Sequence, residues 1–580
     1  MEMAGPTAPK DPEKARPFFY ILKDKDIFGE RQKDGTGIQF IYESDGRLIN
    51  SAQITGNVTD KEELRLLETV EGFGRLVHSI GVSVETDRPE ETAEFVFQMY
   101  GKKDLYGGGT NLTTSLKCDG MEHRIYLSDY RWTEDDHVPG QIKILFASPE
   151  RMGKVSVRLF LNDGYEAPPE EEDLVIDMHS EEYCGMISRS LLQLGNPYRI
   201  RKAIEKSKAG KEVTLAYIGG SITQGAGAIP IHTECYAYKS FQLFQNRFST
   251  QNNVRFIKAG VGGTPSELGM IRFDRDVLRE GERPDIVVIE FAVNDEGDET
   301  KGVCYESLVR KVLKLPWKPA VVLLFSVFAN DWNLQERLRP VGDLYDLPMV
   351  SIRDAVTPQF SLKCGEGRIL SKNQFFYDIF HPNNTGHTIM ADCLQYLFER
   401  CDAAEPARVG TFVEGMTEEQ ILSEKLSGPA VIGADFERIF LLDKKNRYVG
   451  AKIRAGSFTS TDMELQSVEM DGSLIQTPEF PYNWMYDGSR PQMAGFEMEI
   501  ICKSLFLIFK DSGETDVGKA NVFVNDVYCM TADPHKNNWL HCNAVLLFWE
   551  TESRSHKVRI AVTEEDRNKK FTILGFGYTI

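Results

Sequence analysis

Hydrophobic and polar positions alternate with a period of two near both ends of the chain. Between about residues 18 and 165, short alternating segments such as GRLVHSIGVSVET (74–86) are separated by Gly, Asn and Asp. The same pattern returns between about residues 412 and 580, for example in FEMEIICKSLFLIF (496–509). Such runs between turn residues are typical of antiparallel strands. We therefore expect an N-terminal and a C-terminal β-sandwich, each of jelly-roll-like form.

The pattern is different between about residues 196 and 400. Uninterrupted apolar runs occur in EVTLAYI (212–218), DIVVIEFA (285–292) and AVVLLFSVF (320–328). Amphipathic stretches with helical spacing, such as CYAYKSFQLFQNRF (235–248), lie between them. Continuous apolar strands separated by helices predict a parallel sheet that is covered on both faces, in a three-layer α/β domain. Ligands bind such sheets at the carboxyl ends of the strands.

The three stretches with different hydrophobic patterns predict three domains. A chain of 580 residues is too long for a single core, because domains usually hold roughly 100–200 residues. The acidic, proline-bearing stretch EAPPEEED (166–173) is typical of a linker or an exposed loop. The predicted ranges are 1–185 for the N-terminal β-sandwich, 186–405 for the α/β domain and 406–580 for the C-terminal β-sandwich.

One stretch of the α/β region, LAYIGGSITQGAGA (215–228), delivers Ser221 from the end of an apolar strand into a turn of small residues. Glycine and serine are common in turns for purely backbone reasons, so Ser221 alone is weak support for a nucleophile. The alternative is that the open turn gives a reactive hydroxyl the space it needs.

Three further motifs favour the second interpretation. FIKAGVGGTPSELG (256–269) ends a strand in a glycine turn and starts a helix after Pro265, where backbone amides can point at an anion. A third strand ends at Asn294, whose side-chain amide can donate to an oxyanion. Asp378 precedes His381 by three residues, a spacing at which one tight turn lets the carboxylate orient the imidazole. Each motif is common alone, but together they predict a serine hydrolase.

The four motifs in this order resemble the SGNH, or GDSL-like, hydrolase family over roughly residues 200–400. Here Gly220 stands where the family often has Asp, and Ala292 where Gly is usual. The resemblance implies that residues 186–405 form the catalytic domain and that no metal or other cofactor is required. It also implies a set of roles: Ser221, His381 and Asp378 are catalytic, and the oxyanion hole is formed by the backbone N–H of Ser221, that of Gly263 (with Gly262 as the alternative) and the Asn294 amide.

Composition narrows the possible partners and compartment. The net charge of −20 argues against nucleic acid, because phosphate binding needs a basic face. No apolar run approaches the roughly 20 residues of a membrane span. The first residues, MEMAGPTAPKDPEKARPF, carry charges and prolines where a secretory signal has an apolar stretch. The ten cysteines are scattered without a C-x-x-C pair, a pattern that favours reduced thiols. We therefore expect a cytoplasmic protein that binds neither nucleic acid nor membranes.

The flanking sandwiches make the chain similar to multi-domain carbohydrate acetylesterases. The expected reaction is removal of O-acetyl groups, through an acyl-enzyme, from xylan- or mannan-derived oligosaccharides. Candidates for sugar binding are Trp332 with Gln335, and Trp484 with Tyr486, although core packing is the competing interpretation for both tryptophans. Two other functions remain open: a short-chain thioesterase or lysophospholipase of the same family, and a carbohydrate-binding protein without activity. The oligomeric state is left open.

Overall fold

The computed structural model describes residues 15–42, 47–103, 107–170, 172–279, 281–404, 416–473, 475–489 and 494–580. The chain divides into two compact units. The first comprises Met1–Ile176 and Gln359–Gly386, and the second comprises Asp177–Pro358 and His387–Ile580. Most of the stretch on which the compartment prediction rests, residues 1–14, lies outside the described residues.

The first unit contains two antiparallel sheets around one core. One sheet has the strand order β1-β9-β4-β7 and the other β2-β3-β8-β5-β6. Alternate residues of both sheets, including Val82 and Phe97, are buried in the same hydrophobic cluster. This is the expected N-terminal β-sandwich, with helices that the alternating pattern did not predict. Its elements are β1 (Phe18–Phe28), β2 (Glu30–Arg31), β3 (Gly37–Tyr42), α1 (Arg47–Ile54), α2 (Lys61–Leu66), α3 (Val70–Leu76), β4 (Val77–Thr86), β5 (Thr92–Gly101), β6 (Asn111–Lys117), β7 (His123–Tyr126), β8 (Asp136–Phe146), β9 (Met152–Leu161) and α13 (Lys372–Phe375).

The second unit contains the predicted parallel sheet, with the strand order β10-β15-β14-β13-β11-β12. Every neighbouring pair is parallel except β10 with β15, which is antiparallel. The strands are β10 (Leu191–Gln193), β11 (Val213–Gly219), β12 (Val254–Gly260), β13 (Ile286–Glu290), β14 (Ala320–Phe325) and β15 (Met349–Ser351).

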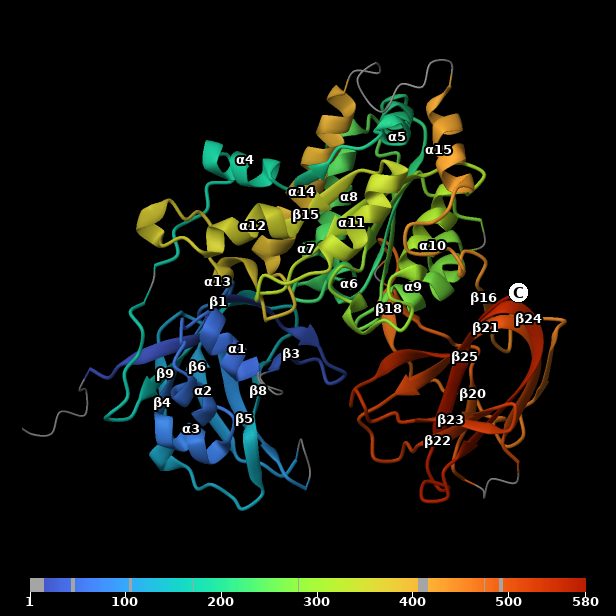
Figure 1. The fold of residues 1–580 in the computed structure, drawn as a ribbon. Helices are drawn as coiled ribbons and strands as arrows, with labels where there is room; N and C mark the ends of the chain where they lie inside the picture. Colours follow the sequence, from blue (N-terminus) through green and yellow to red (C-terminus); the bar gives the residue numbers. More distant parts are fainter. Residues whose placement is uncertain are drawn as a thin grey trace, which may run out of the picture. The chain divides into compact units, whose positions relative to one another are not determined.

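Helices cover both faces of this sheet (Figure 1). On one face, Tyr217 of β11 packs edge-on against Tyr236, and its hydroxyl donates to Ser240 of the same helix, α8. On the other face, Ile218 belongs to a core that includes residues of α9, α10 and α11. The helices of the unit are α4 (Glu181–Ser188), α5 (Tyr198–Lys208), α6 (Ser221–Gln224), α7 (Ile231–Glu234), α8 (Tyr236–Phe248), α9 (Ser266–Phe273), α10 (Val303–Leu313), α11 (Gln335–Tyr345) and α15 (Glu418–Ser427), while α12 (Ile352–Phe360) and α14 (Asn384–Ala403) run across the unit borders.

The C-terminal region forms one connected eight-stranded sheet rather than two separate sheets. Its order is β16-β25-β21-β24-β22-β23, with β17 paired to β21 and β20 paired to β25. The long strands β21 and β24 pair with each other along most of their length and link both halves of the sheet around one core. The strands are β16 (Phe440–Leu442), β17 (Ala451–Arg454), β20 (Trp484–Tyr486), β21 (Phe496–Asp511), β22 (Ala520–Val524), β23 (Val527–Ala532), β24 (His541–Val562) and β25 (Phe571–Thr579), and a separate pair is formed by β18 (Ser467–Glu469) and β19 (Gln476–Pro478).

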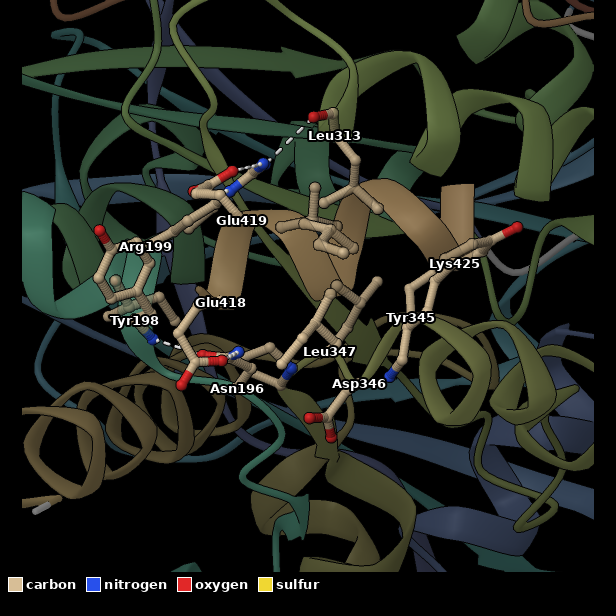
Figure 2. Close-up of a pocket in the computed structure, with 16 residues that line it drawn as sticks. Asn196, Tyr198, Arg199, Leu313, Tyr345, Asp346, Leu347, Glu418, Glu419 and Lys425 are labelled. Atoms are coloured by element: carbon tan, nitrogen blue, oxygen red, sulfur yellow. Dashed lines mark hydrogen bonds and ion pairs between the residues drawn. The ribbon is translucent and has the colours of Figure 1, made fainter. Parts of the chain in front are cut away.

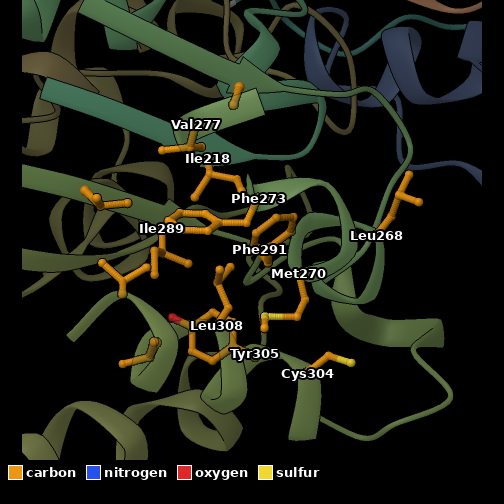
Figure 3. Packing of buried hydrophobic residues seen from close by; sticks show 14 of the residues in the cluster. Ile218, Leu268, Met270, Phe273, Val277, Ile289, Phe291, Cys304, Tyr305 and Leu308 are labelled. Atoms are coloured by element: carbon orange, nitrogen blue, oxygen red, sulfur yellow. The ribbon is translucent and has the colours of Figure 1, made fainter. Parts of the chain in front are cut away.

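From Ser504 to Asp511, strand β21 is buried on both of its faces. Leu505 and Leu507 point into the core of the C-terminal sheet. Phe506 and Ile508 belong instead to the core that contains α9, α10 and α11. Figure 3 shows part of that core, where Phe291 and Leu308 pack among residues of neighbouring elements. One continuous hydrophobic core therefore joins the parallel sheet to the C-terminal sheet.

The predicted domain ranges stay predictions. Residues 359–386, which those ranges assign to the central domain, cluster with the N-terminal unit. The boundary predicted at 405/406 lies outside the described residues, as does Glu171 of the predicted linker.

Replacing Ile289 with Ala should destabilise the protein, because this side chain of β13 is fully buried. We expect the free energy of unfolding to fall by about 2–5 kcal/mol, which urea denaturation followed by circular dichroism measures. The matched control is Ile501→Ala on β21, whose side chain is 47% exposed and should cost less than about 1 kcal/mol. Equal losses in the two variants would contradict the position of Ile289 in the core.

Candidate active site

Ser221 is held at the carboxyl end of β11, beside neighbouring strands of the sheet. The strand ends at Gly219, and Ser221 is the first residue of the short helix α6. The carbonyl oxygen of Gly219 accepts a hydrogen bond from Nη2 of the buried Arg272 at 2.9 Å and one from the N–H of Val261 at 3.2 Å. These contacts fix the backbone just before the serine.

Asn294 lies against the peptide that precedes Ser221. A Cβ atom on Gly220 would come within 2.2 Å of the Asn294 Oδ1 atom and 2.5 Å of its Nδ2 atom. Glycine at position 220, where the family often has Asp, is therefore required by the Asn294 side chain as it is placed here. The Oδ1 atom of Asn294 is buried and has no hydrogen-bond partner among the described residues. The Asn294 side chain thus lies beside the residue that precedes Ser221, and no described residue donates a hydrogen bond to its oxygen.

The two candidate glycines in the turn after β12 differ in whether their N–H groups have a partner. Gly262 donates its N–H to Oε1 of Gln224 at 2.8 Å, whereas the N–H of Gly263 donates to no other described residue. Gly263 has a φ of +72°, a conformation that favours glycine. A Cβ on Gly262 would lie 3.9 Å from the Ser221 Cβ, so the turn runs beside the serine. Of the two candidate glycines, Gly263 is therefore the one that can donate.

Asp378 and His381 form a hydrogen-bonded pair in the first unit. His381 Nδ1 lies 3.0 Å from Oδ1 and 2.9 Å from Oδ2 of Asp378. Oδ1 also accepts the backbone N–H groups of Phe380 at 2.8 Å and His381 at 2.9 Å, which fixes the carboxylate. Because a carboxylate is an acceptor, Nδ1 carries the proton, and Nε2 is the nitrogen that can act as a base.

The candidate sugar-binding residues have different environments. Trp332 is half-buried and stacks on Phe328 with ring centroids 5.7 Å apart, so its role stays a prediction. Gln335 is buried, and its amide is engaged by Asp354 at 3.1 Å and by the Ser351 hydroxyl at 2.5 Å. Its polar atoms already have protein partners, so a sugar-binding role does not fit this placement.

Trp484 and Tyr486 lie in the hydrophobic core of the C-terminal sheet. Trp484 is 5% exposed and packs against Phe496 and Phe576. No face of the indole is open to a sugar, because strand β20 pairs with β25 and directs this residue inward. The proposed sugar-binding role is therefore wrong for this pair, and core packing is the correct interpretation.

Sequence reasoning missed two residues that contact the glycine turn. Trp539 is 43% exposed, and its ring lies so close to Gly263 that a Cβ there would approach it to 2.7 Å. His541 Nε2 lies 3.0 Å from the Gly263 carbonyl oxygen. Neither residue has a sequence signal that links it to a turn more than 270 positions away.

The second unit also has an apolar pocket at the amino ends of the parallel strands, whereas Ser221 follows a carboxyl end. Its lining includes Leu313, Ala320 and Leu347 (Figure 2). Ala320 is the first residue of β14. Arg199 there is engaged by Glu419 at 2.8 Å and by the Leu313 carbonyl at 3.2 Å. Residues of α15 line this pocket together with the ends of the parallel strands. The pocket is separate from the candidate site.

Two carboxylic acids close in sequence to Asn294 and to the glycine turn, Asp295 and Glu267, are buried. Burial raises the pKa of Asp295 to about 8 and that of Glu267 to about 7. Asp295 Oδ1 accepts the N–H of Ser266 at 2.7 Å and so ties the residue after Asn294 to the start of α9. Glu267 Oε1 accepts the N–H of Thr300 at 2.7 Å, so both acids fix backbone groups near α9.

Within the described part of the chain, no group of three or more His, Cys, Asp or Glu residues has a metal-binding arrangement. No described helix has the length and apolar character needed to cross a bilayer.

Asp295→Asn should change the pH dependence of stability. The carboxyl has an ordinary pKa of 3.8 and a folded pKa of about 8, so the folded protein holds a proton that the unfolded chain has released between these values. Its stabilising effect is therefore lost as the pH rises from 4 to 8. The melting temperature of Asp295→Asn relative to wild type should be higher at pH 8 than at pH 5. The control Asp343→Asn, at an exposed position of α11, should show no such change. A difference that does not vary with pH for Asp295→Asn would contradict the buried acid.

Comparison with known proteins agrees with the resemblance seen in the sequence. Residues 217–389 match the family model of the GDSL-like Lipase/Acylhydrolase family. Two solved structures of a two-domain esterase active on acetylated mannans, one co-crystallised with mannopentaose, are each 24% identical to this chain with a TM-score of 0.53. Each match covers 68% of this chain and 98% of the esterase, and it shows a shared fold. A search of curated proteins finds no match. Residues 217–389 of this chain are therefore similar to the GDSL-like lipase/acylhydrolase family, within a protein that carries further sheet-rich regions.

Proposed function

We propose that the protein is a serine esterase that removes O-acetyl groups from plant-polysaccharide oligosaccharides. The observation that supports this most strongly is the uncommitted N–H of Gly263, in a turn that runs beside Ser221 and near Asn294. A backbone N–H that no protein group uses is suited to an oxyanion that forms only during the reaction. Acyl transfer needs this feature, whereas a carbohydrate-binding protein does not.

In the proposed mechanism, His381 Nε2 removes the Ser221 proton as the hydroxyl oxygen attacks the ester carbonyl. Asp378 holds the imidazole through Nδ1 and stabilises its cation. The N–H groups of Ser221 and Gly263 and the Asn294 amide stabilise the tetrahedral oxyanion. His381 then protonates the leaving sugar hydroxyl, and a water molecule hydrolyses the acetyl-enzyme through a second oxyanion. The products are acetate and the deacetylated sugar.

The oligosaccharide part of the proposal is supported by two observations. The solved esterase that shares the fold acts on acetylated mannans. In this chain, the exposed ring of Trp539 lies against Gly263, and ligand sites commonly combine an aromatic face with a few polar groups. Among the possible polysaccharides we therefore favour acetylated mannan over acetylated xylan. A short-chain thioesterase or a lysophospholipase is the competing activity of the same domain.

Ser221→Ala should abolish acetate release from acetylated manno-oligosaccharides while the protein stays folded. Removal of the nucleophile in a serine hydrolase costs about 10⁶-fold in kcat. Mass spectrometry of acetylated manno- and xylo-oligosaccharides, with rates on p-nitrophenyl acetate and p-nitrophenyl laurate, measures both activity and preference. Retention of more than about a thousandth of the wild-type rate would remove Ser221 from the nucleophile role. Faster turnover of the laurate than of all acetyl esters would favour the lipid-directed alternative.

Asp378→Asn should reduce kcat less than His381→Ala does. The Asp378 carboxylate orients the ring and stabilises its cation, whereas His381 itself transfers the proton. Steady-state rates on p-nitrophenyl acetate, with circular dichroism to verify folding, give the order. An unchanged kcat in Asp378→Asn would mean that the carboxylate has no part in the reaction. An equal loss in both variants would mean that the two residues act as one unit.

A further inference from the structure

We propose that Gln466 and His541, two residues of the C-terminal region, are positioning residues of the oxyanion hole. This inference rests on the proposed function and adds to it a role for a region outside the hydrolase domain. Neither residue would touch the substrate. Each acts by holding a peptide group of the turn that contains Gly263.

Gln466 holds the peptide group that contains the Gly263 N–H. The Gly262 carbonyl oxygen and the Gly263 nitrogen belong to the same planar, trans peptide, so the C=O and the N–H point in opposite directions. Gln466 donates from Nε2 to the Gly262 oxygen at 3.1 Å. Its Oε1 atom accepts the N–H of Cys542 at 3.0 Å, which fixes the orientation of the Gln466 amide. The hydrogen bond on one side of the peptide thus aims the N–H on the other side.

His541 holds the next peptide group along the turn. Its Nε2 atom lies 3.0 Å from the Gly263 carbonyl oxygen, and its Nδ1 atom lies 3.0 Å from Oδ2 of Asp511. Both partners are acceptors, so the ring donates to both in the form that carries a proton on each nitrogen. Asp511 ends β21 and is paired across the sheet with His541, which begins β24. The two side chains are 0% and 6% exposed, respectively. Oδ2 of Asp511 also accepts from Nδ2 of Asn537 at 2.5 Å, so the carboxylate that orients the imidazole is itself fixed.

Together these contacts hold three of the four backbone polar groups of Gly262 and Gly263, and among the described residues only the Gly263 N–H of these four has no partner. The N–H of Gly262 is bonded to Gln224, the carbonyl of Gly262 to Gln466, and the carbonyl of Gly263 to His541. The Thr264 hydroxyl donates to the Val261 carbonyl at 2.7 Å. The N–H groups of Gly263 and Thr264 donate to no described residue. A turn fixed in this way holds its donor in place before the oxyanion forms, which is the arrangement that lowers the barrier most.

The test compares Gln466→Met with Gln476→Met, the same substitution at an exposed position of β19 whose side-chain amide donates to Glu469 rather than to the turn. Both acylation and deacylation pass through an oxyanion, so kcat on p-nitrophenyl acetate should fall whichever step limits the rate. We expect Gln466→Met to lower kcat by about 10- to 100-fold, less than the 10²–10³-fold loss of a whole donor, while KM changes by less than about threefold. Gln476→Met should keep the wild-type values.

Two further variants keep the test decisive if Gln466→Met does not fold. Gln466→Glu retains an acceptor for Cys542 but places an oxygen against the Gly262 carbonyl, and His541→Phe retains a ring but removes the donor. Each should lower kcat at pH 8 with little change in KM, in protein whose melting confirms folding. Folded Gln466 variants with a kcat within about twofold of the Gln476→Met control would overturn the inference.

The wild-type enzyme and Ser221→Ala are measured first, because they separate this inference from the proposed function. If the wild type shows no Ser221-dependent hydrolysis, the proposed function fails and this inference fails with it. If that hydrolysis is present and the Gln466 variants keep their kcat, only the inference fails. A rise in KM without a fall in kcat would also contradict it, because a positioning role in the oxyanion hole acts on the transition state rather than on substrate binding.

Discussion

The candidate site depends on the hydrophobic core that joins the parallel sheet to the C-terminal sheet. Strand β21 directs Phe506 and Ile508 into the core formed with α9, α10 and α11, and its other face closes the core of its own sheet. Because the C-terminal half of the strand, from Ser504 to Asp511, is buried on both faces, this end is fixed against the core that contains α9, α10 and α11. Asp511 lies at that end, and the strand paired with it begins at His541. Apolar packing thus sets where polar groups meet the glycine turn.

Glycine at position 220 leaves room for the Asn294 side chain beside the backbone that precedes Ser221. The Asn294 side chain occupies the space that a Cβ atom would need. Asp295, the next residue, accepts the N–H of Ser266 at the start of α9. Arg272 donates to the Gly219 carbonyl at the end of β11. The backbone around Ser221 is therefore held by short contacts with buried polar side chains.

Local patterns in the sequence predicted the fold and part of the site. Continuous apolar runs predicted β11, β13 and β14, and the three-residue spacing predicted the bond between Asp378 and His381, because these depend on neighbours in the chain. The sequence did not reveal the packing of Trp484, because an aromatic residue in a short strand has the same pattern whether it faces a core or a ligand. The contact between His541 and Gly263 spans 278 positions and depends on tertiary packing alone.

The central proposal is that Ser221 is a nucleophile and that His381 is its general base. A fluorophosphonate reacts covalently with an activated serine, and peptide mass spectrometry locates the adduct. We predict one adduct, on the peptide that contains Ser221, and a much slower reaction in the His381→Ala variant. Labelling of a different serine, or labelling of Ser221 at an unchanged rate without His381, would contradict the claim.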